Sequence, residues 1–502
     1  MKKILFLNLL TLIMLFSCTK ETHIDEKLST KSSIDAKALN DTYFISEQQA
    51  REFIAKVYKE TDIKGISTVS SNGSPTMYII NFDEGWKIVS ADKRMPPILA
   101  FSNTGYFDDT WTDNPGTKMW VGTLNGLCAT IRAKNESSNK NTEIWDTKTY
   151  SADLKKSVSI KKSSPHGMWT KIKISETSNE SQTMLYGPYT ETTWGQDAPW
   201  NNNFPVDQLS VEEPKLSYIL QNHTQTSNGK YNTGCVAVAL SQLFYYYHFK
   251  YGHPSGQYAS ISVSAQSPAG IIAVYSNGLD TIYVRGKHIS LNRNNYEEPS
   301  PRWSMMAKSK TSGGNTSYVS DLMLDVGNRA NISYSSYFGS GGTVQDAFNA
   351  LQYYGLQASM GNFQKDSIIY NLMQERPVFA GGYNYEGYGH AWVIDGYYKS
   401  TITKRIKYRW LLGYNAQEGI GEPATYEEAL EAAESMGMDK PEDPMETEQT
   451  IQTIYDFYNM NYGWDGDRNG FYLMVYPGLD INIPYLQYQY NVLTIYNIAP
   501  IQ

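Results

Sequence analysis

The chain has 502 residues and a formal net charge of -8. This length exceeds what a single hydrophobic core usually serves, so we expect about two or three domains. The acidic balance, with no basic run beyond short lysine pairs, argues against a nucleic-acid partner. The 40 Tyr, 38 Gly and 11 Trp are typical of a loop-rich and strand-rich exported protein rather than a helical bundle.

The first residues have the layout of a bacterial export signal. A basic MKK start is followed by an apolar run over residues 4–16, too short to span a bilayer, and then by LFSC. This pattern resembles a lipoprotein signal, in which residues 1–17 are removed and Cys18 carries the lipid. Plain secretory cleavage is the alternative, because Phe16 is bulky. We therefore expect an exported protein, either secreted or an outer-membrane or cell-surface lipoprotein that contacts a membrane only through Cys18, with residues 18–40 as a flexible tether.

Residues 41–133 are predicted to form a small α+β domain. The stretch SEQQAREFIAKVYKE has Ser46 as a helix N-cap with Gln49 three residues later, and its apolar positions share one face. Two short apolar runs flank the turn signal at 83–85, which predicts a hairpin, and PPILAFS predicts a third strand. The helical run that follows contains Cys128, which we expect to be a packed small hydrophobe.

A change of composition marks the main domain boundary. Residues 134–185 are rich in Lys, Ser, Thr and Asn with weak periodicity, so we expect a linker that contains the processing region. The second domain, residues 186–502, contains two apolar-faced helical stretches and several short apolar runs typical of strands. Within it, residues 399–453 form an acidic insertion whose Ala and Glu content predicts a short surface helix.

One cysteine lies at the start of a predicted buried helix. In YNTGCVAVALSQLFYYYHFK, residues 231–250, apolar side chains recur at helical spacing after the cysteine. Asn232 and Thr233 are the candidate N-caps, and Gly234 permits a tight turn. Cys235 would therefore lie at the positive end of the helix dipole, which favours the nucleophilic thiolate. A packed, unreactive cysteine is the alternative, because free cysteines are commonly buried.

Acyl transfer by a thiol also needs a base, an orienting group for that base, and donors for the oxyanion. His390 follows a Gly-rich loop and begins the strand-like run HAWVIDGYY, which makes it the candidate base. Asn461 could hold the tautomer of His390, with Trp464 shielding that hydrogen bond from water. Gln196, in WGQ, could present its amide beside the backbone N–H of Cys235. Each of these residues could instead be structural, as a lone histidine usually is.

The sequence argues against metal and nucleotide chemistry. It contains no H-E-x-x-H, paired C-x-x-C, G-x-S-x-G or phosphate-loop motif. DGDRNG, residues 465–470, matches the first half of a calcium loop, but Tyr476 occupies the place of the required Glu, so a hairpin turn is expected. No cofactor and no metal are predicted, and the expected partners are protein or peptide substrates.

Several ordered stretches carry a resemblance to a known family: GPYTETTWGQDAPWNNNFP, TGCVAVALSQLFYYY, DVGNRANISYSSYFGSGG, RPVFAGGYN followed by GHAWVIDGYY, and NYGWDGDRNGFY. They resemble the motifs of streptopain-type cysteine peptidases, peptidase family C10. YIINFDEGWKIVSADKRMPPILAFSNTG is similar to the Spi-type inhibitory propeptide domain of those proteins. The cysteine and histidine are 155 residues apart, close to the gap of roughly 130 to 150 in papain-like enzymes.

The resemblance implies an α+β, papain-like catalytic domain, in which a helical side bears Cys235 and a twisted antiparallel sheet bears His390. It also implies that Gln196 completes the oxyanion hole and that Asn461 and Trp464 lie in the segment supporting the histidine. The preceding small α+β domain would block the cleft until the linker is cut.

We therefore predict a cysteine endopeptidase made as a zymogen, with its own propeptide as inhibitor. A transglutaminase-like acyl transferase on the same scaffold is one alternative. The other is a catalytically inactive surface lipoprotein that acts as an adhesin or inhibitor. Two features depart from the family pattern: Tyr462 stands where Trp is usual, and the insertion at 399–453 is long.

Overall fold

The computed structural model describes residues 43–134, 139–145, 169–204, 226–252, 261–276, 281–293, 302–334, 340–383, 389–412, 446–474 and 491–501. The predicted signal peptide, Cys18 and the tether lie outside these ranges, as does nearly all of the acidic stretch expected to form a surface helix. Within the described ranges, no helix is both long and apolar enough to cross a membrane.

The N-terminal domain combines helices with an antiparallel meander. Its elements are α1 (Glu47–Val57), β1 (Gly65–Ser71), β2 (Ser74–Asn81), β3 (Trp86–Ser90), β4 (Ile98–Ser102), the 3-10 helix η2 (Asp109–Asp113), α2 (Pro115–Lys134) and α3 (Asn139–Trp145). The capping box predicted between Ser46 and Gln49 is confirmed at the start of α1. The predicted hairpin is also confirmed, because β2 pairs antiparallel with β3 across the turn at 83–85.

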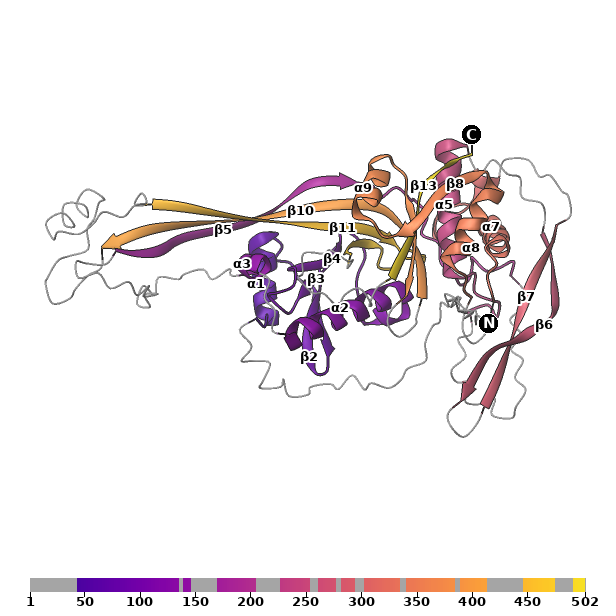
Figure 1. Ribbon diagram of the computed structural model, residues 1–502, viewed down its shortest axis with the longest axis horizontal. Coiled ribbons are helices and arrows are strands. Elements are labelled where there is room, and N and C mark those ends of the chain that lie inside the picture. The colour runs from indigo at the N-terminus through magenta and orange to yellow at the C-terminus, as the bar shows by residue number, and fades with distance from the viewer. Residues whose placement is uncertain are drawn as a thin grey trace, which may run out of the picture.

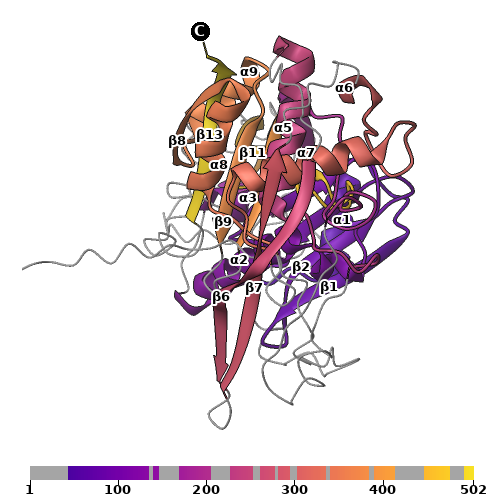
Figure 2. The same cartoon turned by 90° about the vertical axis from the view of Figure 1, so that its right-hand side faces the viewer.

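Helices of the C-terminal domain gather around α5, which carries the candidate cysteine. The helical elements are α5 (Cys235–Tyr251), α6 (Arg302–Met305), α7 (Thr316–Arg329), α8 (Val344–Leu351), the 3-10 helix η3 (Gln352–Tyr354) and α9 (Lys365–Met373). α5, α7 and α8 lie together on one side of the molecule (Figures 1 and 2). Val236, Leu240 and Phe244 of α5 are fully buried in a cluster with side chains of α7 and α8. The hairpin of β6 (Ile261–Ser276) and β7 (Thr281–Arg293) projects from this side (Figure 2).

One antiparallel sheet runs through both domains. Its C-terminal strands are β8 (Leu356–Asn362), β9 (Val378–Tyr383), β10 (Gly389–Leu412), β11 (Glu446–Asn461), β12 (Gly470–Leu473) and β13 (Asn491–Pro500). The strand order is β1-β2-β3-β4-β12-β11-β10-β9-β13-β8. β4 and β12 join the two domains, with Phe101 opposite Phe471 and Ala100 opposite Tyr472. The fold is therefore α+β, with a helical side packed on an antiparallel sheet, as predicted.

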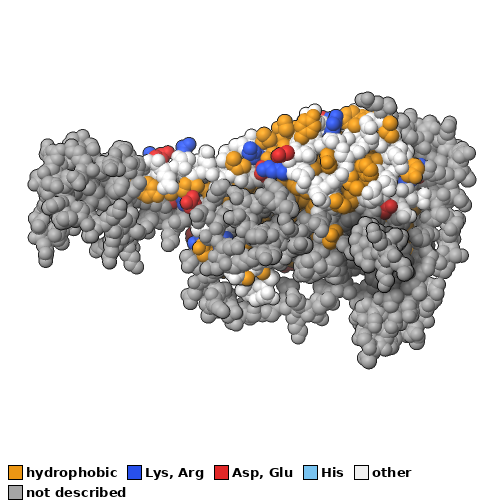
Figure 3. All heavy atoms as spheres, in the orientation of Figure 1, with side chains coloured by type: hydrophobic (Ala, Val, Ile, Leu, Met, Phe, Trp, Pro, Cys, Tyr) orange, Lys and Arg blue, Asp and Glu red, His pale blue; other side chains and the backbone are white. Residues whose placement is uncertain are grey.

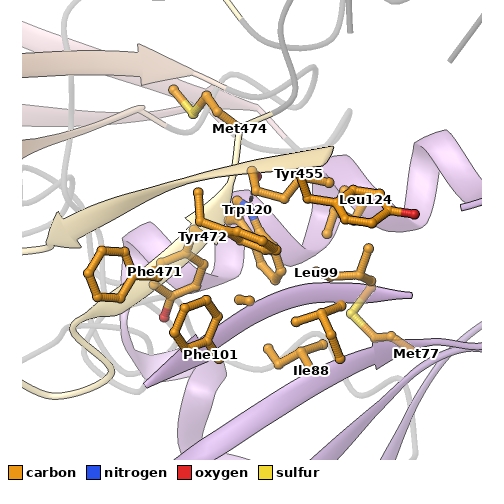
Figure 4. Close-up of a cluster of buried hydrophobic side chains, with 14 of the residues drawn as sticks. Met77, Ile88, Leu99, Phe101, Trp120, Leu124, Tyr455, Phe471, Tyr472 and Met474 are labelled. Atoms are coloured by element: carbon orange, nitrogen blue, oxygen red, sulfur yellow. Dashed lines mark hydrogen bonds between the residues drawn. The ribbon is translucent and has the colours of Figure 1, made fainter. Parts of the chain in front are cut away.

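The two domains share a hydrophobic core at this junction. Figure 4 shows Phe101 and Trp120 of the N-terminal domain beside Phe471 and Tyr472 of β12. The indole of Trp120 donates a hydrogen bond of 3.0 Å to the carbonyl oxygen of Leu473. Ring centroids of Phe101 and Phe471 are 5.2 Å apart in a stacked arrangement. Separation of the domains would therefore expose both a strand edge and a large apolar surface.

Three long strands extend beyond the body of the molecule (Figure 1). β10 pairs on one side with β11 and on the other with β5 (Trp169–Tyr186), out to Leu412 opposite Trp169. We call the outer part of this ribbon, residues 169–182, 400–412 and 446–455, the arm.

The arm differs from what the sequence suggested. Residues 134–185 were expected to be a linker, yet their described part includes α3 and β5. The flanks of the insertion at 399–453 are likewise continuations of β10 and β11. β5 pairs only with β10, so it is an edge strand, and its many polar side chains obscure the apolar periodicity that predicts a strand.

Candidate active site

The candidate nucleophile is the first residue of α5. Cys235 is 1% exposed, and Gly234 before it is the N-cap of the helix, with a φ of 87°. A Cβ at Gly234 would lie 3.0 Å from the carbonyl oxygen of Ser340, so the turn requires glycine. The prediction of Asn232 or Thr233 as N-cap is wrong, because Gly234 takes that position and no side chain caps the helix. The first-turn N–H groups of α5 are therefore not engaged by an N-cap side chain.

Gln196 lies beside the start of α5. Its backbone carbonyl accepts a hydrogen bond of 3.0 Å from the N–H of Thr233, two residues before Cys235. The Gln196 side chain is 3% exposed, and its Nε2 has no hydrogen-bond partner among the described residues. Leaving a buried amide donor unpaired costs about 1–3 kcal/mol. Such a group is therefore a candidate for binding an atom that arrives with a ligand.

His390, the candidate base, is fully buried near the start of β10. Its Nε2 lies 2.8 Å from the backbone carbonyl oxygen of Tyr462. Because a carbonyl oxygen can only accept, Nε2 carries a proton, and in the neutral ring Nδ1 is the basic nitrogen. The next residue, Ala391, belongs to the same hydrophobic cluster as Cys235, so β10 packs on the side of the molecule that carries the cysteine.

Two aromatic rings frame the imidazole of His390. The Trp392 ring is nearly parallel to it, at an interplanar angle of 9° and a centroid distance of 6.3 Å. The Tyr462 ring lies 6.1 Å from the imidazole. Tyr462 also packs against the start of α2, because a Cβ at Gly116 would lie only 2.1 Å from its ring. The N-terminal domain therefore reaches the residue whose carbonyl holds the histidine.

Asn461, the last residue of β11, belongs to a buried hydrogen-bond network. Its Nδ2 donates to the carbonyl oxygen of Thr192 over 2.8 Å and to Oε1 of Gln242 over 3.1 Å. Gln242 donates in return to Asn461 Oδ1 over 3.3 Å. Gln242 is fully buried two turns after Cys235, so this network ties the helix of the cysteine to the strand of the asparagine. The hydrogen bond expected between the side chains of Asn461 and His390 stays a prediction.

A buried carboxylate supports the same network. Asp395 on β10 accepts hydrogen bonds from the backbone N–H of Thr190, over 2.9 Å, and from its hydroxyl. Asn461 Nδ2 lies 3.2 Å from the Thr190 Oγ1 and donates to it. Burial raises the pKa of the Asp395 carboxyl to about 6, outweighing the hydrogen bonds from Thr190, which lower it.

Two known protein families match parts of this chain. Residues 194–416 match the Peptidase C10 family, and residues 35–126 match the Spi protease inhibitor family. The chain belongs to the peptidase C10 family. It is a cysteine-type peptidase with an N-terminal Spi-type propeptide domain.

Individual relatives of this C10 peptidase are distant. Streptopain from Streptococcus pyogenes serotype M1 is 24% identical over 363 residues, which cover 70% of this chain and 76% of streptopain. A prointerpain A fragment from Prevotella intermedia covers 86% of this chain and 97% of its own, at 17% identity and a TM-score of 0.45. Active interpain A from the same organism covers 62% of this chain and 95% of its own, at 18% identity and a TM-score of 0.32.

The propeptide domain of this C10 peptidase holds the turn after β11. Arg468 in that turn donates to the carboxylate of Asp108 and, over 2.7 Å, to the hydroxyl oxygen of Thr110. Asn114 donates from Nδ2 to the carbonyl oxygen of Asp467 over 3.2 Å. Arg468 is 4% exposed, so its charge depends on these partners and on the adjacent carboxylate of Asp467.

Trp464 and the calcium-like sequence lie in the same turn. Trp464 is half-buried, and its carbonyl accepts from the N–H of Asp467 over 2.9 Å; its role in shielding the histidine stays a prediction. Asp465, the first residue of DGDRNG, pairs with Lys310 over 2.7 Å and accepts from the indole of Trp200. Within the part of the chain that the structure describes, no group of three or more His, Cys, Asp or Glu side chains could hold a metal ion.

The sequence analysis overlooked Gln242, Asp395 and Thr190. Two of them, Gln242 and Asp395, could have been noticed from the sequence alone. Gln242 is a polar residue within the apolar helix after the cysteine, and Asp395 is a charge inside the apolar run HAWVIDGYY. Because buried polar groups need partners, such isolated polar residues mark places where other polar residues must meet them.

Proposed function

We propose that this protein is an exported cysteine endopeptidase, made as a zymogen, in which Cys235 is the nucleophile and His390 the general acid and base. The Cys235 sulfur attacks the carbonyl carbon of a peptide bond and forms a C–S bond. His390 passes the thiol proton to the leaving amine as the C–N bond breaks. Water, deprotonated by His390, then hydrolyses the thioester, releasing the acid product and restoring the thiol.

The observation that carries this proposal is the unpaired buried amide of Gln196, a residue beside the start of α5, where no side chain caps the helix. In the proposed reaction, Gln196 Nε2 and the N–H of Cys235 donate to the negative charge that develops on the carbonyl oxygen. The positive end of the α5 dipole favours both that oxyanion and the Cys235 thiolate. The hydrogen bond from the N–H of Thr233 to the Gln196 carbonyl brings this residue to the start of the helix that Cys235 begins.

The hydrogen bond from His390 to Tyr462 supports the assignment of the base. A proton fixed on Nε2 leaves Nδ1 to exchange protons with Cys235 and with the leaving amine. In this proposal, the Tyr462 carbonyl shares with Asn461 the orienting task that the sequence analysis gave to Asn461 alone. Trp464 would exclude water from the same region.

For domain organisation, we propose that the inhibitory part extends to residue 145, beyond the boundary expected at 133. α3 supports this, because the indole of Trp145 donates to the carbonyl of Met95 over 3.3 Å and its ring lies 4.6 Å from Phe53. Since β5 is hydrogen-bonded into the sheet from Trp169 onward, we place the activating cut between residues 146 and 168.

For location, we propose export by the N-terminal signal, with either a lipid on Cys18 or release as a secreted enzyme. The support is the basic start, the short apolar run and LFSC. Metabolic labelling with a radioactive fatty acid would test for the lipid. If Cys18 carries it, wild type should be labelled and Cys18→Ala should not.

The direct test of function is self-processing of the chain from Thr19 onward, with casein present. We expect wild type to release a fragment that starts between residues 146 and 168 and to degrade casein. Cys235→Ala should do neither, whereas Cys128→Ala, which alters the other buried cysteine among the described residues, should behave as wild type. If wild type stays inert even after nicking by trypsin, the proposed function is wrong.

A further inference from the structure

The arm has one covered face, and its opposite face is exposed from Arg405 on β10 and Ile454 on β11 outward. Along β10, Lys404 is buried whereas Arg405 and Lys407 are exposed. On β11, Tyr455 is 7% exposed and its neighbour Ile454 is 54% exposed. Because alternate residues of a strand point to opposite faces, this alternation means that one face packs against another layer. Charged side chains of both signs are interspersed on the visible surface of the arm (Figure 3).

The layer that covers the arm is the propeptide domain. Two side chains of the arm donate hydrogen bonds to α3. Lys404 donates to the carbonyl oxygen of Glu143 over 2.7 Å. The Tyr455 hydroxyl donates to Asn141 Oδ1 over 3.0 Å. Ile402 of the arm is 1% exposed in the same hydrophobic cluster as the buried side chains of α1 and α3. One face of the arm therefore makes both polar and apolar contacts with the propeptide domain.

A charge cluster adds a second contact, made by α1. Lys56 of α1 pairs with Glu176 of β5 over 2.8 Å, and Lys404 approaches the same carboxylate to 3.7 Å. The side chains of Glu176 and Lys404 are each 2% exposed. Buried charges of this kind depend on their partners, so removal of one partner weakens an interface strongly.

These contacts lie far from the reacting groups. Lys404 follows His390 by 14 residues on β10, and at about 3.3 Å per residue of strand this is roughly 45 Å. A contact at that distance cannot obstruct the cleft. It can only contribute to holding the propeptide domain in place.

We propose that the arm is a docking surface for the propeptide domain, residues 43–145, and keeps this domain bound after the chain is cut. A cut between residues 146 and 168 leaves β5 paired with β10, so the arm stays intact in the catalytic part. Cleavage alone then does not free the enzyme, because the inhibitor must also leave the arm. The inference rests on the proposed function only for the position of the cut.

The test uses the full chain from Thr19 in a Cys235→Ala background, with the recognition sequence of an external site-specific protease substituted for residues 152–158. After cutting, dissociation of the two parts is followed by size-exclusion chromatography and by a dilution-jump fluorescence assay. The variants are Lys404→Met on the arm and Lys56→Met on the propeptide domain. Lys407→Met, on the exposed face of the same strand, is the matched control.

We expect the cut parent and Lys407→Met to co-elute as a complex. Lys404→Met and Lys56→Met should dissociate roughly tenfold to a hundredfold faster. Lys56→Met keeps the test decisive if Lys404→Met fails to fold. The inference is overturned if the parent separates at once, or if both variants dissociate as slowly as Lys407→Met. Because no catalysis is needed, this outcome is independent of whether the chain proves to be an active peptidase.

Discussion

Gln242 on α5 and Asn461 on β11 exchange two amide hydrogen bonds, of 3.3 and 3.1 Å, inside the catalytic domain. The pair joins the helix that begins with Cys235 to the strand that ends beside the residue holding His390. The two side-chain amides are buried and hydrogen-bond each other. Loss of either hydrogen bond would leave a buried polar group without a partner. The relative position of Cys235 and His390, the proposed nucleophile and base, therefore depends on this pair.

Gln242→Leu should lower kcat roughly tenfold to a hundredfold and change KM less, because it disturbs the alignment of Cys235 and His390 rather than substrate contacts. Steady-state kinetics of the processed enzyme on a peptide substrate would measure both constants. Gln345→Leu, an exposed glutamine on α8, is the matched control and should leave kcat unchanged. A variant of Gln242 with wild-type kcat would contradict the positioning role.

Gln196→Ala should lower kcat by about a hundredfold to a thousandfold, the usual loss when one oxyanion donor is removed. Because the proposed role of Gln196 is to donate to the oxyanion and not to the sulfur, the rate at which a small alkylating reagent modifies Cys235 should change little. Parallel kinetics and alkylation would separate the two effects. An equal loss in both rates would mean that Gln196 acts by holding the start of α5 instead.

The free energy of unfolding should depend on pH through Asp395. Its carboxyl has a pKa of about 6 in the folded protein and 3.8 as its ordinary value. Between these values the folded state binds more protons than the unfolded state, so stability falls as pH rises through that window. Above pH 6 the buried carboxylate therefore lowers the free energy of unfolding by about 3 kcal/mol, at 1.36 kcal/mol for each pKa unit.

Asp395→Asn removes this cost while keeping an acceptor for Thr190. We therefore expect the thermal midpoint of the variant, relative to wild type, to rise between pH 4 and pH 7. Thermal unfolding of both proteins in the Cys235→Ala background would measure the difference without self-digestion. A constant difference across this range would show that Asp395 does not titrate as described.

The sequence was sufficient to predict residues whose local pattern is strong. The capping box at Ser46 is formed, and Cys235 begins its helix as expected. His390 lies near the start of a strand, as its place before an apolar run predicted, and its role as base stays a prediction. These predictions rest on neighbours in the chain, so they need no knowledge of tertiary contacts.

Other features depend on contacts between distant segments. Gln242 meets Asn461 across 219 residues, and the Tyr462 carbonyl reaches His390 across 72. A backbone carbonyl has no sequence signal at all, so its hydrogen bond to the histidine could not be predicted. β5 was missed for the same reason, because an edge strand with polar side chains is defined by its pairing with β10.

Asp108→Asn should speed the onset of self-processing roughly twofold to tenfold, since it removes the carboxylate that the propeptide domain offers to Arg468. The gain is modest because Asp108 is largely exposed, where ion pairs are screened by water. Asp109→Asn, next to it and also exposed, is the matched control and should process at the wild-type rate. The lag before peptide hydrolysis begins would report the difference, and equal lags would contradict it.

The most direct measurement of the central claim is to map where an irreversible thiol-reactive peptidyl probe attaches. The processed enzyme would be labelled, digested and read by mass spectrometry, with His390→Ala and the unprocessed chain in parallel. We expect the adduct on Cys235 of the processed wild type, at least a hundredfold slower labelling in His390→Ala, and no adduct on Cys128. If the probe ignores Cys235, or labels it equally fast without His390, then Cys235 and His390 do not act as a catalytic pair.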